Sequence, residues 1–120
     1  MSMTDAFIAF DCGFVINPDG LLNQVEGGLL QGLSRARHER VRFNRGKVTS
    51  LNWNDYPILT FAELPEVRTR LIFRKDVGWG SAGEAGTVAA PAALANAVFD
   101  AIGKHPRRVP LDNAFLKTLL

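Results

Sequence analysis

The stretch from Gly78 to Gly103 decides how this chain folds. It reads Gly-Trp-Gly-Ser-Ala-Gly-Glu-Ala-Gly over residues 78–86, then Thr-Val-Ala-Ala-Pro-Ala-Ala-Leu-Ala-Asn-Ala-Val-Phe-Asp-Ala-Ile-Gly over residues 87–103. The first part is a loop with little side-chain bulk and one carboxylate, Glu84. Glycines let a backbone approach another group closely, and a following helix points its unpaired N–H groups and positive end at the loop. This layout suits a ligand-facing carboxylate. A solvated Glu near a helix N-terminus has the same local sequence, so the stretch alone leaves both interpretations open.

The alanine-rich part of the stretch predicts a helix with Pro91 in its first turn and Gly103 at its end. Leu94, Val98 and Ile102 recur at a spacing of four, which places them on one inward face. The many alanines on this helix favour close packing against a second helix.

An earlier helix is predicted to begin at Asn17-Pro18, because Asn is a favoured N-cap and Pro a favoured first residue. Its buried stripe repeats every four residues, at Leu21, Val25, Leu29 and Leu33. The glycines at 27, 28 and 32 each cost about 1 kcal/mol relative to Ala in a helix interior. Close approach of a backbone or of a ligand is expected to offset that cost. Gln24 and Gln31 lie two turns apart on one face, either toward a ligand or as two surface glutamines.

The remaining segments predict strands and one short helix. Residues 6–12 are expected to form a strand buried on both faces, 41–49 a β-hairpin with Gly46 at positive φ, and 67–74 a strand with one buried face. Asp112 is expected to cap a last helix that ends at Leu119. This order predicts an α+β fold in a single domain, 1–120: an antiparallel sheet with two main helices packed on one side and a short C-terminal helix.

The composition limits the class of protein. Apolar residues make up 47% and charged residues 22% of the 120, as in globular proteins, and a formal charge of +2 is too small to indicate a nucleic-acid partner. The single cysteine, Cys12, excludes an internal disulfide and a cysteine cluster for zinc or iron–sulfur, so a reducing, cytoplasmic compartment is expected. No run reaches the roughly 20 apolar residues of a membrane span, and none is expected.

Several motifs occur in order along the chain: Asp11-Cys12-Gly13 with Asn17-Pro18, Gln24-Val25-Glu26-Gly27-Gly28, Gln31-Gly32-Leu33, Asp55-Tyr56-Pro57, and Gly83-Glu84-Ala85-Gly86 with the alanine-rich run from Ala92. In combination they resemble the C-terminal part of the large, molybdenum-binding subunit of the xanthine dehydrogenase and aldehyde oxidase family. The resemblance is greatest to the isoquinoline 1-oxidoreductase β-subunit branch. It covers about Ala6 to Leu111, but only roughly the last sixth of such a subunit.

The resemblance implies a molybdopterin cofactor, in its cytosine dinucleotide or its mononucleotide form with the dinucleotide favoured, and oxidative hydroxylation of N-heteroaromatics or aldehydes. It implies that Glu84 is the general base, that Gln24 contacts the cofactor, and that the backbone of Ser81, Ala82 and Gly83 lines it. None of these residues is expected to ligate the metal. The family's proline after the Glu is Ala85 here, and the branch's Gly-Gly-Val-Gly-Glu run is Gly-Ser-Ala-Gly-Glu, so the loop is expected to be less rigid.

Most cofactor contacts in the family come from segments that have no counterpart here. The isolated chain is therefore expected to hold half a site, to bind no cofactor and to be inactive alone. A homo-oligomer or a larger companion chain is expected to complete it, with an iron–sulfur or cytochrome redox partner. The other hypothesis is a non-enzymatic domain of the same fold that acts as an interaction or accessory module.

Overall fold

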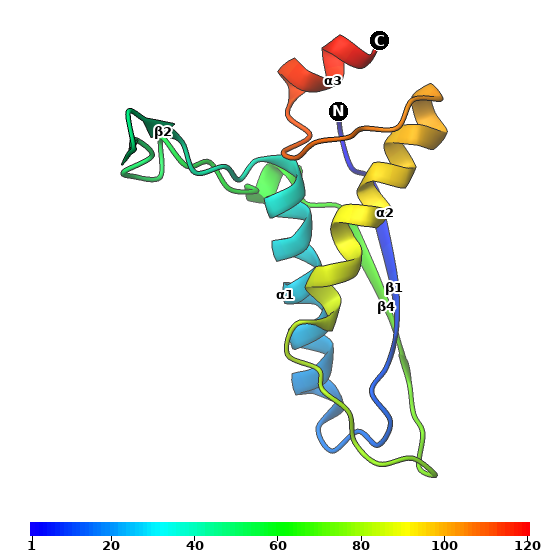
Figure 1. The fold of residues 1–120 in the computed structure, drawn as a ribbon. Coiled ribbons are helices and arrows are strands. Elements are labelled where there is room, and N and C mark those ends of the chain that lie inside the picture. The colour runs from blue at the N-terminus through cyan, green and yellow to red at the C-terminus, as the bar shows by residue number, and fades with distance from the viewer.

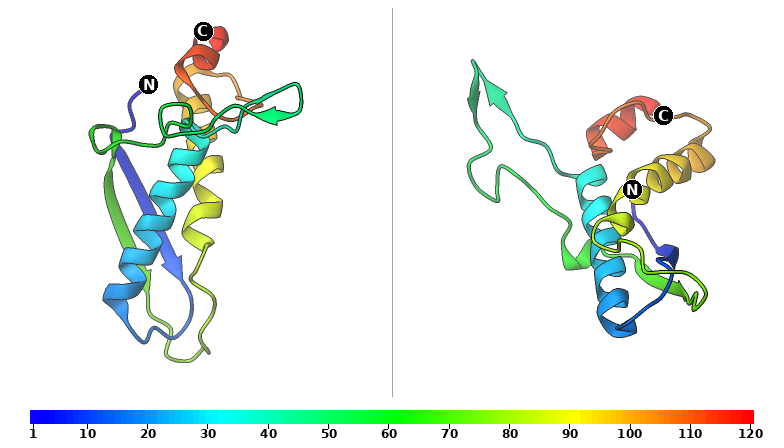
Figure 2. Two further views of the ribbon diagram at one scale, coloured as in Figure 1. Left: turned by 90° about the vertical axis from the view of Figure 1, so that its left-hand side faces the viewer. Right: turned by 60° about the horizontal axis from the view of Figure 1, so that its bottom comes forward.

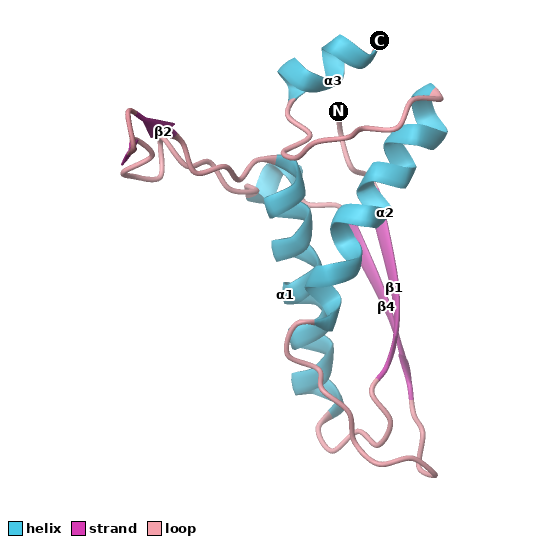
Figure 3. Cartoon of the chain, in the orientation of Figure 1, coloured by secondary structure: helices cyan, strands magenta, loops and turns pink.

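A computed structural model describes all residues, 1–120. Two long helices lie side by side in front of a pair of strands, and a hairpin projects away from them (Figures 1 and 3). The elements in chain order are β1 (Asp5–Asp11), α1 (Pro18–Arg37), β2 (Phe43–Asn44), β3 (Lys47–Val48), a 3₁₀ turn (Phe61–Glu63), β4 (Glu66–Ile72), α2 (Ala85–Ile102) and α3 (Asn113–Leu119). The α+β class, the packing of the two main helices and the short C-terminal helix are confirmed.

The sheet beside the helices differs from the predicted one. β1 and β4 run parallel, in register from Asp5–Glu66 to Asp11–Ile72, and the antiparallel pair is the separate hairpin of β2 and β3. The prediction of an antiparallel main sheet was therefore wrong. The reason is that α1 returns the chain to the starting edge of β1, so the next long strand runs in the same direction. Residues 6–12 are also not buried on both faces, because Phe7 on β1 is 71% exposed.

The helix ends follow the sequence, with one exception. The Asn17 side chain accepts a hydrogen bond from the Gly20 N–H at 3.0 Å, and Gly103 ends α2 at a φ of 70°. α2 begins at Ala85, so Pro91 lies inside the helix and not in its first turn. Proline removes one helical donor and costs roughly 3 kcal/mol in a helix interior. Packing of the residues before it against α1 keeps the first turn and a half helical.

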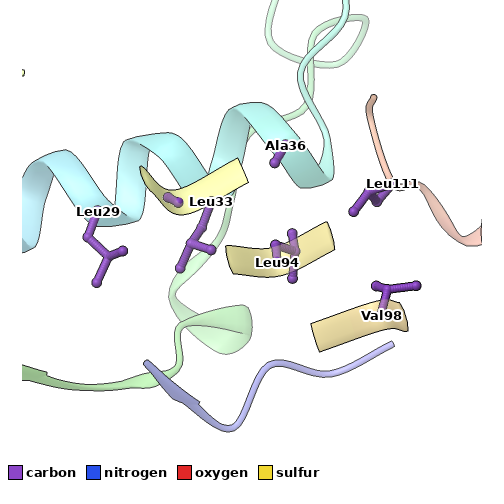
Figure 4. Close-up of a cluster of buried hydrophobic side chains, with 7 residues drawn as sticks. Leu29, Leu33, Ala36, Leu94, Val98 and Leu111 are labelled. Atoms are coloured by element: carbon purple, nitrogen blue, oxygen red, sulfur yellow. The ribbon is translucent and has the colours of Figure 1, made fainter. Parts of the chain in front are cut away.

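The core lies between α1, α2 and the start of the C-terminal segment (Figure 4). It contains Leu29, Leu33, Ala36, Ala90, Leu94, Val98 and Leu111. Arg37 is buried at its edge, where Nη1 donates to the Leu111 carbonyl at 2.6 Å and Nη2 to Asn113 Oδ1 at 2.7 Å. A second cluster of Phe10, Leu21 and Val25 lies at the opposite end of α1. The two clusters fix α1 along its whole length.

Residues 39–60, called the arm below, leave the body after α1 and carry the hairpin (Figure 2). Gly46 has the predicted positive φ, 78°, in the turn between β2 and β3. At its base the arm is tied to α1 by Ser34, whose hydroxyl donates to Glu39 Oε1 and accepts from the Leu59 N–H at 3.0 Å. Within the arm, the Tyr56 hydroxyl donates to Glu39 Oε2 at 2.9 Å.

By length and composition alone, α2 is the one helix apolar enough to cross a membrane. In the structure it packs on α1 through Gly86, Ala90 and Leu94, which are buried. In all, 22% of the residues of α2 are buried in the structure.

Candidate functional site at the start of α2

Glycines on both helices bring the first turn of α2 against α1. A Cβ on Gly86 would lie 2.6 Å from the Val25 carbonyl oxygen, and a Cβ on Gly32 would lie 2.5 Å from the Thr87 carbonyl oxygen. Real Cβ atoms do not approach oxygen so closely, so only glycine fits at these two positions. The predicted cause of the costly helix glycines, close approach of another backbone, is present at Gly28 and Gly32. Gly27 faces open space and has no such neighbour.

Glu84 stands at the N-cap of α2 and is exposed. Its side chain caps no backbone N–H and forms no ion pair, while its carbonyl accepts from the Thr87 N–H at 2.9 Å. The positive end of the helix therefore lies beside a carboxylate with no protein partner. A carboxylate in this condition can accept a proton or face a cation or ligand.

The backbone before Glu84 is also open. None of the N–H groups of Ser81, Ala82, Gly83 and Glu84 donates to a backbone carbonyl. Successive unpaired N–H groups next to a helix N-terminus favour an anion. The side chain of Ala82 differs from its neighbours because it packs against the cluster of Phe10, Leu21 and Val25. It anchors the loop, so only its backbone is left to line a ligand.

The structure brings Gln24 to this loop. Its Nε2 donates to the Gly83 carbonyl oxygen at 2.5 Å, across 59 residues of sequence. Gln31 does not join it, because it lies two turns further along α1, where it lines a hollow of about 390 Å³ at the base of the arm with Trp53 and Tyr56. The predicted residues Gln24, Ser81, Ala82, Gly83 and Glu84 therefore lie together.

A second loop supports the first, and sequence reasoning assigned it no role. The Gly80 N–H donates to the Cys12 carbonyl at 2.6 Å, and Gly13, at a φ of 79°, lies against Gly78. These segments follow β4 and β1, and the carboxyl ends of parallel strands meet at one edge. The glycine that ends the Asp11-Cys12-Gly13 motif was the available signal.

A larger hollow, of about 790 Å³, is lined by the N-terminal segment, α2 and α3, and it contains neither Glu84 nor Gln24. The predicted residues thus form an exposed surface at the start of α2.

Comparisons with known proteins identify the family of the chain. Residues 1–65 match the family described as "Molybdopterin cofactor-binding domain", and that match includes Gln24 but ends before Glu84. The chain is 38% identical to the B subunit of nicotinate dehydrogenase from Pseudomonas putida over 92% of its own length, which is 9% of that protein. It is 34% identical to the β subunit of isoquinoline 1-oxidoreductase from Brevundimonas diminuta over 95% of its length and 14% of that protein.

The fold also matches a solved structure. Quinoline 2-oxidoreductase from Pseudomonas putida 86 superposes on 96% of the chain with a TM-score of 0.86 and 28% identity, and the match covers 16% of that chain. The chain therefore spans less than a fifth of the length of each of these three proteins. The match over residues 1–65, more than half of the chain, confirms the resemblance, and the chain belongs to the molybdopterin cofactor-binding domain family of the molybdenum hydroxylases.

Proposed function

We propose that this chain forms the wall of a molybdenum hydroxylase site that carries the general base. Glu84 is that base, Gln24 contacts the cofactor, and the backbone of Ser81, Ala82 and Gly83 lines it. The observation that carries the proposal is the exposed, unpaired carboxylate of Glu84 at the N-terminus of α2, beside a loop that Gln24 binds.

The residues fit molybdopterin as a ligand. Molybdopterin is anionic, and the loop offers four N–H groups without backbone acceptors together with the positive end of an 18-residue helix. No neighbouring atom lies within 4 Å of the Cβ position at Gly78 or Gly83, so a bulky group has room there. When bound, the cofactor supplies a metal centre that accepts the two electrons of an oxidative hydroxylation.

The chain's own residues supply proton transfer and positioning. Glu84 accepts a proton as the substrate is hydroxylated, which is the role of a general base. Gln24 has donors and an acceptor on one amide, so it can bind the loop and a ligand at the same time. The substrates are N-heteroaromatics or aldehydes and the cofactor form is the cytosine dinucleotide, as the family resemblance implies.

A companion chain completes the site, and the isolated chain is inactive. This part of the proposal is supported by the exposed position of Glu84 and by the small share of each relative that the chain covers. The names of both relatives describe them as subunits. An iron–sulfur or cytochrome partner then receives the electrons, in a cytoplasmic complex.

One observation favours the alternative, a non-enzymatic interaction module. The arm and the turn after it expose large apolar side chains, including Phe43 at 66%, Trp53 at 74% and Phe61 at 93%. An exposed apolar surface of this kind is typical of a protein contact. It fits a module that binds a partner without catalysis.

Metal analysis separates the two functions. The tagged chain is purified from its own cells together with any chain that accompanies it, and each fraction is assayed for molybdenum and for pterin fluorescence. We expect both only where a companion chain is present. Stoichiometric molybdenum on the isolated chain would contradict the proposal that a companion chain completes the site. Absence of molybdenum from every fraction would favour the non-enzymatic interaction module.

The base is tested in the molybdenum-containing fraction. Glu84→Gln is expected to lower kcat at least about 100-fold, within the usual contribution of general base catalysis, while bound molybdenum is unchanged. Asp100→Asn, which removes an exposed carboxylate from the same helix, is the matched control and should leave kcat unchanged. Full activity in Glu84→Gln would exclude Glu84 as the base.

A further inference from the structure

The segment Ser81–Glu84 has one polar contact with another element of the fold. That contact is the hydrogen bond from Gln24 Nε2 on α1 to the Gly83 carbonyl oxygen. The other bonds of the segment run from Thr87 and Val88 to the Glu84 carbonyl, within the start of α2 itself. Besides these, only the Ala82 side chain attaches the segment to the core.

The contact continues the line of glycine contacts between the helices. Gly32 meets Thr87, Gly28 meets Thr87 and Gly86, and Gly86 meets the Val25 carbonyl, so the contacts move toward the start of α2 as one moves back along α1. Gln24, the residue before Val25, continues this series, because its side chain donates to the Gly83 carbonyl. The bond therefore fixes the last peptide before the Glu84 backbone.

The residue type matters at this position. The Gly83 carbonyl needs a donor, and the neighbouring Glu84 carboxylate makes a second negative charge unfavourable. An ionised Glu at position 24 has the size of Gln but can only accept hydrogen bonds. A neutral amide provides a donor without charge, and it keeps a second N–H and its oxygen for a ligand.

We infer that Gln24 is a positioning residue: by binding the Gly83 carbonyl it holds the Gly83–Glu84 peptide against α1 and so sets where the Glu84 carboxylate stands. What that carboxylate then does rests on the proposed function. The hydrogen bond itself rests on the geometry of this chain.

The test measures order in the loop of the full chain, without cofactor, by NMR. Backbone ¹⁵N order parameters of Gly83, Glu84 and Ala85 are compared in the wild type, Gln24→Glu and the matched control Gln31→Glu. The control adds the same charge to the same face of α1, two turns away. We expect Gln24→Glu to lower the order parameters of these residues from about 0.85, typical of rigid backbone, to below about 0.6. Gln31→Glu should leave them unchanged.

The pH dependence identifies the hydrogen bond as the cause. When the introduced carboxyl is protonated, below about pH 4, it gains an O–H donor, so order should return in Gln24→Glu as pH falls. Gln24→Met, which has similar length and no donor, should lose order at every pH. Gln24→Met also tests the inference if Gln24→Glu does not fold.

Unchanged order in both Gln24 variants would overturn the inference, and so would equal losses in Gln24→Glu and Gln31→Glu. Loss of order without recovery at low pH would overturn the hydrogen bond as its cause. Because no molybdenum is used, these outcomes are independent of the metal analysis that tests the proposed function.

Discussion

Glu63 is the carboxylate whose surroundings favour its charge most clearly. Its Oε2 accepts from the Thr60 hydroxyl at 2.8 Å and from the Thr60 N–H at 3.0 Å, and these two bonds lower the pKa of Glu63 below its usual range. The nearby charges of His38 and Arg37 lower the pKa further, but less. His38 Nε2 lies 3.0 Å from Glu63 Oε1, although without hydrogen-bond geometry.

The lowered pKa predicts how stability depends on pH. Because the folded pKa is below the unfolded value of about 4.3, the contribution of Glu63 is fully present above that pH and is lost as pH falls through the folded pKa. We expect Glu63→Gln to be less stable than the wild type at neutral pH, by less than about 1 kcal/mol, since the side chain is 39% exposed. The difference should shrink below about pH 4. Urea unfolding at several pH values measures it.

Asp100→Asn is the control, because Asp100 is exposed and forms no ion pair. A stability difference between wild type and Glu63→Gln that stays constant down to low pH would contradict the assigned cause.

The candidate site was predictable from the sequence as a set of residues. Glu84 in a glycine loop before a helix, and Gln24 on the preceding helix, lie together as the resemblance implies. The direction of the Gln24 side chain was not predictable, because it depends on a carbonyl 59 residues away. The inward turn of Ala82 depends in the same way on the cluster formed by Phe10 and Leu21.

At the scale of elements, the α1–α2 contact sets the position of the site, and it depends on single glycines. At Gly32 a Cβ would lie 2.5 Å from the Thr87 carbonyl oxygen and 2.7 Å from the Ala90 Cβ. Both neighbours are parts of α2 that cannot yield without moving the helix. The first turn of α2, which carries Glu84, would move with it.

We therefore expect Gly32→Ala to destabilise the chain by about 1–3 kcal/mol, the usual cost of overpacking, despite the better helix propensity of Ala. Gly27→Ala is the matched control on the same helix. Nothing lies within 4 Å of its Cβ position, so a gain of about 0.5–1 kcal/mol is expected. Free energies of unfolding in urea provide the comparison. Equal effects of the two substitutions would mean that the helices do not meet at Gly32.

The elements themselves were largely predictable, because caps and periodicity are local signals. The helices begin or end at the caps that the sequence predicts, which are Asn17, Gly103 and Asp112. Two errors have long-range causes. Strand direction is set by how α1 returns the chain, which alternation of residues does not encode. The start of α2 before Pro91 depends on packing against Gly28 and Gly32, which overrides the local preference of proline.

At the scale of the whole molecule, the chain is extended and much of its apolar surface is uncovered. The arm projects from the helices in every view, and its side chains Phe43, Leu51 and Trp53 are 66%, 79% and 74% exposed (Figures 1 and 2). Only 18 of the 120 residues are buried, so most of the chain, the arm included, is in contact with water. Apolar surface left in water favours association.

We expect the isolated chain to form dimers or larger species, which multi-angle light scattering would detect as concentration rises. Replacing Phe43 and Trp53 together by Ser should shift the chain toward the monomer, because each exposed aromatic side chain removes apolar surface from water when it is covered. Ile16→Ser is the control, since Ile16 is 80% exposed but lies outside the arm, before α1. A wild-type chain that remains monomeric at high concentration would contradict the association. Association that the arm variant does not reduce would place the contact on another face, such as the apolar hollow beside α2 and α3.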